Sequence, residues 1–364
     1  GSMDLWQHGL AADGKGNVYV CGDTESVTLP KATNAPNLDQ RYRAFVAKLD
    51  PTGKPIWSTF VTSSRPGFDV RSFWNSDFND VKVDRDGNVY AFGNGYQGLT
   101  GSKTDLSGNF VTRFTPSGEI VWTTYLGDGN RGSGVRLGLA LDGVGNAWVA
   151  NTSGEDEMVG LKNSRVGHHD QYLAKISSSG SVEWLKFGGG PGRDDILDLA
   201  LDAKGGIYLI GEADFFRHAK PGEDYGLPNP RNGFHGGRMD GVIQRWNTSG
   251  DVVWTRYIGG EDNDDLRTIS VGSDGFLYVG GHSESDKLEG QKGEREGDSL
   301  FFAKVSLDGD VAWTAFAGLS EGVLGEQTVY AGSAIYAPSI TRGGGVSKVS
   351  TEDGKMIWHV KAND

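Results

Sequence analysis

Histidine, arginine and tyrosine side chains gather in two long segments in the middle of the chain. The candidate ligand-binding residues are His168 and His169 in residues 165–170, and Arg217, His218, Tyr225, His235 and Arg238 in residues 213–240. Imidazole, guanidinium and phenol groups placed close together can abstract a proton or recognise a sugar. The plainer interpretation is that polar residues collect in loops that face water.

An aromatic and basic cluster lies in residues 65–74 of an otherwise acidic chain. Its candidate binding residues are Arg65, Phe68 and Trp74. Aromatic rings of this kind stack on sugars or pack against a partner protein. They can equally fold back to cover the centre of the protein, and the sequence favours neither interpretation.

Two acidic runs invite a calcium interpretation, because calcium prefers several oxygen ligands. They are Asp194-Asp195 and residues 261–265. Neither run has the spacing of a loop that wraps a single ion, so we expect solvated turns at both places and no bound cofactor. The sequence also carries no G-x-S-x-G elbow, H-E-x-x-H helix or phosphate-binding loop, and we assign no catalytic residue.

The overall charge argues against nucleic acid as a partner. The net charge of −13 comes without any basic block, whereas phosphate backbones are bound by clustered lysine and arginine. Cys21 is the single cysteine, which rules out an intrachain disulfide. No apolar run reaches the roughly 18 residues of a membrane helix. We therefore expect no nucleic-acid binding and no membrane span.

Two aromatic residues recur along the chain and mark an internal repeat. The first follows a glycine turn inside an apolar strand, at Tyr19, Tyr90, Trp148, Tyr208, Tyr278 and Tyr336. The second is a tryptophan after another turn, at positions 57, 122, 184, 254, 313 and 358. The copies are on average about 60 residues apart. Similarity at a fixed period is typical of propellers and other repeat folds.

Each repeat can be divided into four strands, which we call a, b, c and d. Strand a is a short apolar run that usually ends in aspartate, strand b carries the first aromatic, strand c alternates, and strand d carries the tryptophan. A single sheet of four antiparallel strands cannot bury both of its faces. Both faces become buried when the sheets stack radially around a common axis. We therefore predict an all-β fold, a six-bladed β-propeller of four-stranded antiparallel blades, because no gap between copies is wide enough for a seventh.

The repeats also place the blade boundaries and the faces. Residues 1–3 have the sequence of a cloning scar, and residues 4–364 form one domain. The blades are expected at about residues 9–61, 79–126, 138–187, 198–258, 268–316 and 327–360. The a–b and c–d turns share one face of a propeller and are short here. The b–c and d–a connections share the other face and are long, so we place any binding site there.

A cation recurs in strand c of every repeat. The positions are Lys48, Arg113, Lys175, Arg245, Lys304 and Lys348. A ring of six charges could bind an anion. We expect a structural role instead, because long cationic side chains in outer strands extend to solvent and pair with neighbours.

Three stretches of the first repeat have a specific residue order. Residues 17–24, Asn-Val-Tyr-Val-Cys-Gly-Asp-Thr, are followed by residues 44–54, Ala-Phe-Val-Ala-Lys-Leu-Asp-Pro-Thr-Gly-Lys, and by residues 56–59, Ile-Trp-Ser-Thr. This order resembles the bacterial SBBP-type β-propeller repeats, over about residues 10–360. The resemblance implies a propeller fold, frequent export and a binding role. Residues 348–358 are also distantly similar to quinoprotein propeller repeats, but the eight blades and cysteine pair that this similarity would imply are lacking.

Three functional hypotheses follow from the sequence. The first is a non-catalytic binding or scaffold module, monomeric and extracellular or periplasmic, that presents its loop-rich face to a protein or glycan. The second is a carbohydrate-active enzyme, a polysaccharide lyase or hydrolase, that uses histidine, tyrosine and arginine on the same face. The third is a structural repeat domain of a larger surface protein.

Overall fold

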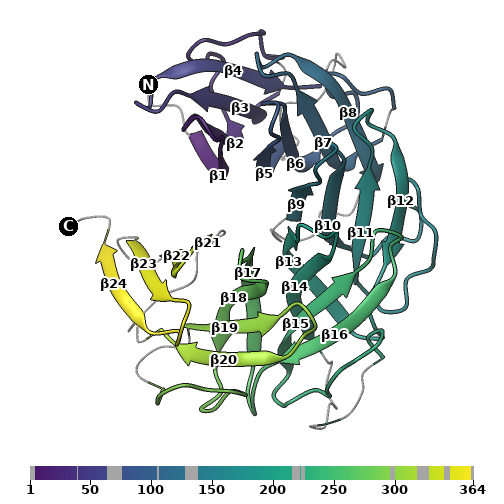
Figure 1. The fold of residues 1–364 in the computed structure, drawn as a ribbon. Helices are drawn as coiled ribbons and strands as arrows, with labels where there is room; N and C mark the ends of the chain where they lie inside the picture. The colour runs from purple at the N-terminus through teal and green to yellow at the C-terminus, as the bar shows by residue number, and fades with distance from the viewer. Residues whose placement is uncertain are drawn as a thin grey trace. The chain divides into compact units, whose positions relative to one another are not determined.

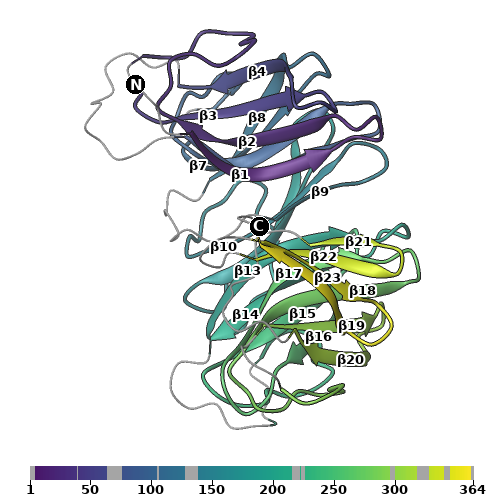
Figure 2. The ribbon, with the colours of Figure 1, turned by 90° about the vertical axis from the view of Figure 1, so that its left-hand side faces the viewer.

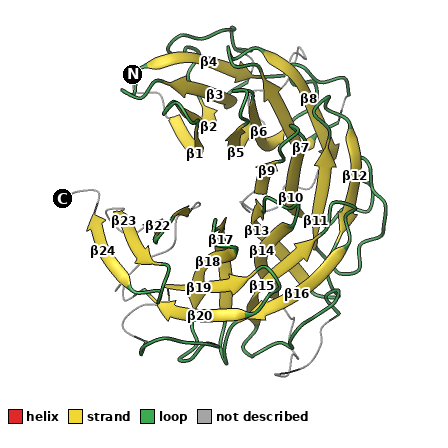
Figure 3. Cartoon of the chain, in the orientation of Figure 1, coloured by secondary structure: helices red, strands yellow, loops and turns green. Residues whose placement is uncertain are grey.

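The computed structural model describes residues 5–38, 40–63, 76–104, 106–127, 138–214, 222, 226–295, 300–317, 328–339 and 345–361. Regular structure within these residues is entirely β-strand (Figures 1 and 3). The strands form six four-stranded antiparallel sheets, each made of four consecutive strands. These sheets are the blades of a six-bladed β-propeller, so the predicted fold class is confirmed. No helix capable of crossing a bilayer occurs in the described segments.

The chain divides into two compact units. Unit 1 comprises residues 1–149, 153–164 and 173–186, and it contains blades 1 and 2 and most of blade 3. The strands of blade 1, side by side in Figure 2, are β1 (Leu5–Ala12), β2 (Val18–Thr24), β3 (Arg43–Leu49) and β4 (Pro55–Val61). Those of blade 2 are β5 (Asp77–Val83), β6 (Val89–Gly95), β7 (Gly108–Phe114) and β8 (Ile120–Gly127). Those of blade 3 are β9 (Gly138–Leu141), β10 (Ala147–Ser153), β11 (Asp170–Ile176) and β12 (Val182–Phe187).

Unit 2 comprises residues 150–152, 165–172 and 187–364, and it contains blades 4 to 6. The strands of blade 4 are β13 (Arg193–Leu201), β14 (Ile207–Asp214), β15 (Met239–Trp246) and β16 (Val252–Ile258). Those of blade 5 are β17 (Asp264–Val271), β18 (Phe276–Ser283), β19 (Leu300–Ser306) and β20 (Val311–Phe316). Those of blade 6 are β21 (Val329–Ala331), β22 (Ala334–Ser339), β23 (Gly345–Ser350) and β24 (Met356–Lys361).

An aspartate closes the a–b turn in the first four blades. The Asp13 carboxylate accepts hydrogen bonds from the backbone N–H groups of Lys15 and Asn17, both at 2.9 Å. Gly16 between them has a φ of 81°, a conformation that favours glycine. The same bonds are made in the next three blades by Asp84, Asp142 and Asp202. These turns fix the register of strand b beside strand a.

The recurring cation of strand c lies over the aromatic ring of strand b. In blade 1, Lys48 is in register with Tyr19 on one side and Trp57 on the other. Its Nζ atom lies 5.1 Å from the centre of the tyrosine ring, where the ring electrons attract a cation. Equivalent contacts at 5.2 to 5.7 Å join Arg113 with Tyr90, Lys175 with Trp148, Lys304 with Tyr278 and Lys348 with Tyr336. The structural interpretation of these cations is confirmed.

The tryptophan of strand d closes the contact with the following blade. In unit 1, Trp57 Nε1 donates a hydrogen bond to the Pro116 carbonyl at 3.0 Å. In unit 2, Trp313 Nε1 donates to the Thr351 carbonyl at 3.3 Å. Both indoles are almost fully buried, at 4% and 3% exposed. Aromatic side chains therefore fill these two junctions between successive blades, as the repeat predicts.

Candidate functional site

In blades 1 to 5 the b–c connector folds back along the outer edge of strand d. The contact is a parallel bridge to the residue that directly follows the strand d tryptophan. The bridged pairs are Ala32 with Ser58, Ser102 with Thr123, Leu161 with Leu185, Pro230 with Thr255 and Gln291 with Thr314. Because strand d is the last strand of its sheet, the bridge pairs backbone groups that an edge strand leaves open.

We call the bridging segment of each connector the latch, and its five copies share a pattern that the sequence analysis missed. The latches are residues 29–33, 99–103, 158–162, 227–231 and 288–292. Each begins with leucine or methionine and ends with lysine, arginine or threonine. The third residue has a positive φ, from 53° at Asn229 to 85° at Gly101. Its carbonyl accepts a hydrogen bond from strand d at 2.9 to 3.2 Å in every latch.

Further contacts hold the latches to the blades. In four of them, the N–H of the fifth residue donates to a strand d carbonyl at 2.7 to 2.9 Å. A strand d hydroxyl donates to the carbonyl of the second residue in four latches, as from Thr255 to Pro228 at 2.6 Å. The first residue is buried in four latches, with Leu99, Leu227 and Leu288 each 2% exposed, and partly buried in the first. The connectors are therefore ordered on the scaffold at these points.

Replacing Thr255 by valine should loosen the fourth latch and leave the blade folded. Thr255 is fully buried, and valine keeps its shape while leaving the Pro228 carbonyl unsatisfied, a cost of about 1–3 kcal/mol. We expect faster deuterium exchange at the Arg231 amide, which donates to the Thr255 carbonyl. Leu185→Val is the control, because residue 185 carries no hydroxyl in the wild type. Unchanged exchange at Arg231 would show that the hydroxyl does not hold the latch.

Four of the predicted binding residues lie in the described part of the chain. They are His168, His169, His235 and Arg238, on the b–c connectors of blades 3 and 4, and all belong to unit 2. The other predicted residues lie outside the described residues, namely Arg65, Phe68, Trp74, Arg217, His218 and Tyr225.

Two of these connectors meet at the start of β13. His169 forms a parallel bridge with Arg193, and Arg193 is in register with Asp214 on β14. Arg238 binds the Asp214 carboxylate through Nε at 3.1 Å and Nη2 at 2.7 Å. The Arg238 backbone N–H also donates to Asn263 Oδ1 at 2.8 Å. The Arg238 guanidinium therefore forms a two-bond ion pair with Asp214 and is already bound within the protein.

His235 has a comparable structural contact. Its backbone N–H donates to Asp240 Oδ2 at 2.7 Å, and its Nδ1 atom lies 3.3 Å from the same oxygen. Asp240 is fully buried, and burial raises the pKa of its carboxyl against the opposing effect of the His235 contacts. His235 therefore anchors the blade 4 connector to the start of β15.

A cluster of five charges, the Glu212 cluster, lies at the ends of the first two strands of blades 4 and 5. Its members are Arg193, Asp195, Glu212, Asp265 and Arg267, all in unit 2. Glu212 is in register with Asp195, and Arg193 Nε lies 2.8 Å from Asp195 Oδ2. Arg267 binds Asp265 through contacts of 2.5 to 3.0 Å. The cluster thus contains two arginine–aspartate pairs and one further carboxylate.

Glu212 is the half-buried carboxylate of this cluster. No hydrogen bond or ion pair joins its side chain to another described residue. Burial raises its pKa to about 7, and the charges of Asp265 and Asp195 add to the rise, while Arg267 and Arg193 oppose it. Glu212 therefore gains or loses its proton near neutral pH and can receive a positively charged group.

The expectation of solvated turns is wrong for Asp194-Asp195 and for the last two residues of the second run, whereas Glu261 and Asp262 lie in an exposed bend. Asp194, Asp195, Asp264 and Asp265 are only 0 to 5% exposed and belong to β13 and β17. Asp194 accepts a hydrogen bond from the Gly190 N–H at 2.6 Å, and Asp264 accepts one from the Gly260 N–H at 2.7 Å. Asp194 and Asp264 therefore shape the d–a connectors that precede their strands. The described residues form no cluster of three or more side chains suited to a metal ion.

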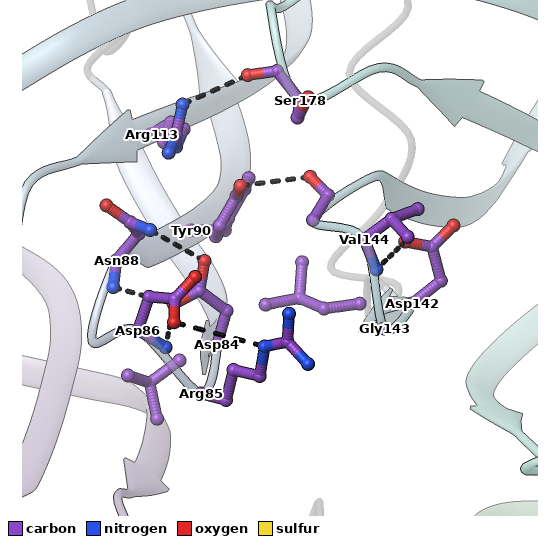
Figure 4. A pocket seen from close by; sticks show the side chains of 13 residues that line it. Asp84, Arg85, Asp86, Asn88, Tyr90, Arg113, Asp142, Gly143, Val144 and Ser178 are labelled. Carbon is purple, nitrogen blue, oxygen red and sulfur yellow. Dashed lines mark hydrogen bonds and ion pairs between the residues drawn. The ribbon is translucent and has the colours of Figure 1, made fainter.

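A polar pocket of about 410 Å³ lies in unit 1, on the face of the short turns (Figure 4). It is lined by the a–b turns of blades 2 and 3 and by Arg113 and Ser178. Arg113 Nη1 donates to the Ser178 carbonyl at 3.1 Å, and the Tyr90 hydroxyl donates to the Gly145 carbonyl at 2.9 Å. These groups hold the two turns together, and we assign no ligand to the pocket.

Comparisons with known proteins give one curated relative and several solved structures of similar fold. No family model matches the chain. The regulatory protein FlaEY of Caulobacter vibrioides is 28% identical over 120 residues, which cover 33% of this chain and only 12% of FlaEY. This chain therefore corresponds to a small part of that relative's length.

Solved structures with a similar fold have little sequence identity to the chain. A chain of the mitotic checkpoint complex has a TM-score of 0.54 and 10% identity, and the match covers 100% of this chain and 82% of that one. BamB from Moraxella catarrhalis has a TM-score of 0.46 and 14% identity, covering 98% and 76%. The Dos1 propeller has a TM-score of 0.47 and 9% identity, covering 98% and 71%. At such identities a likeness concerns the fold alone.

Proposed function

We propose that the chain is a non-catalytic binding module that presents the b–c and d–a face of blades 4 and 5 to a protein partner. The observation that carries the proposal is the Glu212 cluster, in which a half-buried carboxylate beside two arginine–aspartate pairs has no bonded partner among the described residues. A lysine or arginine side chain supplies the matching charge. Complementary charges of this kind favour fast and specific association.

The contacts around the cluster favour binding over catalysis. Latches order the connectors before a partner arrives, which lowers the entropic cost of association. Two of the groups that a lyase could use are engaged within the protein, Arg238 with Asp214 and His235 with Asp240. One solved structure of similar fold belongs to a protein complex, the mitotic checkpoint complex, which is consistent with a protein as the partner.

Glu212→Gln should reduce the affinity for the partner about tenfold at pH 7.5, or about 1.4 kcal/mol. The immobilised full chain is used to capture proteins, which are quantified by mass spectrometry, and the affinity is then measured with the purified partner. Glu352→Gln is the matched control, because Glu352 is exposed in the c–d turn of blade 6. Equal binding of the partner by the wild type, Glu212→Gln and Glu352→Gln would show that the Glu212 cluster is not part of the binding site. Polysaccharide cleavage that is lost in Glu212→Gln or His169→Ala would overturn the non-catalytic assignment.

A further inference from the structure

The last blade has too short a connector to form its own latch. Its b–c connector is residues 340–344, whereas the shortest latched connector is residues 96–107. A latch must pass from strand b to the outer side of strand d and return to strand c. With strands about 4.8 Å apart, this path needs about 24 Å, more than the roughly 22 Å that the six extended steps from residue 339 to residue 345 can span. Blade 6 therefore cannot cover its own outer edge in this way.

Accordingly, the outer edge of β24 is open as far as the structure is described. β24 is the last strand of its sheet (Figure 1). β23 pairs with its inner side, and no described residue forms a bridge to its outer side. His359 follows Trp358 and thus occupies the position that receives the latch in the other blades. The five equivalent residues are 0 to 5% exposed, whereas His359 is only half-buried. The exposure of His359 is what the loss of a latch predicts.

We propose that the outer edge of β24, centred on His359, binds an extended segment of a partner polypeptide that carries the latch pattern. The segment lies parallel to β24, its third residue accepts a hydrogen bond from the His359 N–H, and its fifth residue donates to the His359 carbonyl. Five copies of the bridge within the chain, four of them with both hydrogen bonds, show the geometry that fits the edge. The mode of binding is strand addition, in which main-chain bonds supply affinity and side chains supply specificity.

The third residue of the incoming segment must be one that accepts a positive φ. Glycine holds this position in three of the latches, and the other two have Lys31 and Asn229. Glycine adopts the conformation without steric cost. A β-branched residue there would prevent the segment from reaching the edge.

The first residue of the segment distinguishes the partner from the chain's own latches. In blade 4, Leu227 packs in an apolar cluster with Val242 and Tyr257. The equivalent positions of blade 6 are Gly345 and Lys361, which are in register with each other. A cationic side chain thus replaces an aromatic one, and we infer an acidic first residue in the partner segment. The pattern expected is an acidic residue, glycine two positions later, and lysine, arginine or threonine two positions further on.

The probe is a fluorescein-labelled peptide copying residues 286–293, with glutamate in place of Leu288. Its binding to the full chain is measured by fluorescence anisotropy. We expect saturable binding that His359→Thr retains, because threonine stands at this position in blades 2, 4 and 5. His359→Pro, which lacks the N–H donor, should weaken binding at least tenfold. A peptide N-methylated at its fifth latch residue lacks the N–H that donates to the His359 carbonyl and should also bind at least tenfold more weakly. This second test uses the wild-type protein, so it does not depend on whether a variant folds.

The outcomes separate this proposal from its alternatives and from the function proposed for the Glu212 cluster. No binding at several millimolar peptide, or equal binding of the N-methylated peptide, overturns it. If the peptide with leucine at its first latch residue binds more tightly than the peptide with glutamate there, the inference of an acidic first residue is overturned. Concentration-dependent dimerisation abolished by His359→Pro would assign the edge to a second copy of the chain and overturn the partner segment. Glu212→Gln should leave peptide binding unchanged, since residue 212 lies in blade 4 and residue 359 in blade 6.

Discussion

Replacing Gly211 by alanine is expected to unfold blade 4 at urea concentrations that the wild type survives. A β-carbon at Gly211 would lie 1.8 Å from the Asp195 carbonyl oxygen and 2.8 Å from its carbonyl carbon. Both atoms belong to the main chain, so β13 would have to move away from β14. The contact lies beside the irregularity in pairing between Ile196 and Asp198. We expect a loss of at least about 3 kcal/mol in the free energy of unfolding.

Gly143→Ala is the matched control for this substitution. Its β-carbon would meet no atom within 4 Å, and Gly143 has no positive φ. Its stability should stay within about 0.5 kcal/mol of wild type. Equal urea midpoints for the two variants would show that the close approach at Gly211 does not constrain the blade. Gly281→Ala should match Gly211→Ala, because its β-carbon would lie 1.9 Å from the Asp265 carbonyl oxygen.

The blades could be predicted because the residues that make each structural contact recur in several copies of the repeat. Tyr19, Lys48 and Trp57 are far apart along the chain, yet they form one row across blade 1. The same three residue types recur at the same places in later repeats, so ambiguity in any single strand is resolved by the others. The aspartate turns and the tryptophan contacts follow the same logic.

The latches were missed because their repetition is not visible at a fixed spacing. They lie in connectors of different length, and the third residue is Lys31 or Asn229 where a glycine pattern would be sought. The shared property is a positive φ and a backbone hydrogen bond, neither of which a single residue type encodes. Only the coordinates bring the five segments into equivalent positions.

The structure shows contacts of two predicted binding residues that the sequence does not reveal. His235 and Arg238 were selected for their chemistry, and both are held by aspartates. Asp195, which looked like part of a solvated turn, is buried beside Glu212 because β13 begins already at Arg193. Sequence patterns indicate which side chains are polar, but they do not show which polar groups are already paired.

Buried aspartates at the blade junctions should make the stability of the protein depend on pH. Asp194 is 3% exposed. Burial, with added repulsion from Asp170, Asp195 and Asp214, raises its pKa from 3.8 to about 7, although the Gly190 N–H opposes the rise. The folded state thus keeps a proton that the unfolded chain releases. The contribution of this proton to the free energy of unfolding is fully present below about pH 4 and is lost as the pH rises towards 7. Above pH 7 the free energy of unfolding does not change further from this group. The total loss is on the order of 4 kcal/mol.

Asp194→Asn should therefore stabilise the protein at pH 8 and leave it unchanged at pH 4. Asparagine keeps an oxygen for the Gly190 N–H and carries no charge. We expect a flatter dependence of the urea midpoint between pH 4 and 7 than in the wild type. Asp50→Asn is the control, because the pKa shift of Asp50 has the opposite direction. Hydrogen bonds from Thr52 and Lys54 lower the pKa of the exposed Asp50 carboxyl, so its replacement should not stabilise the protein at pH 8. If Asp194→Asn lowers the midpoint at pH 8, the carboxylate is charged in the folded protein and its neighbours stabilise it.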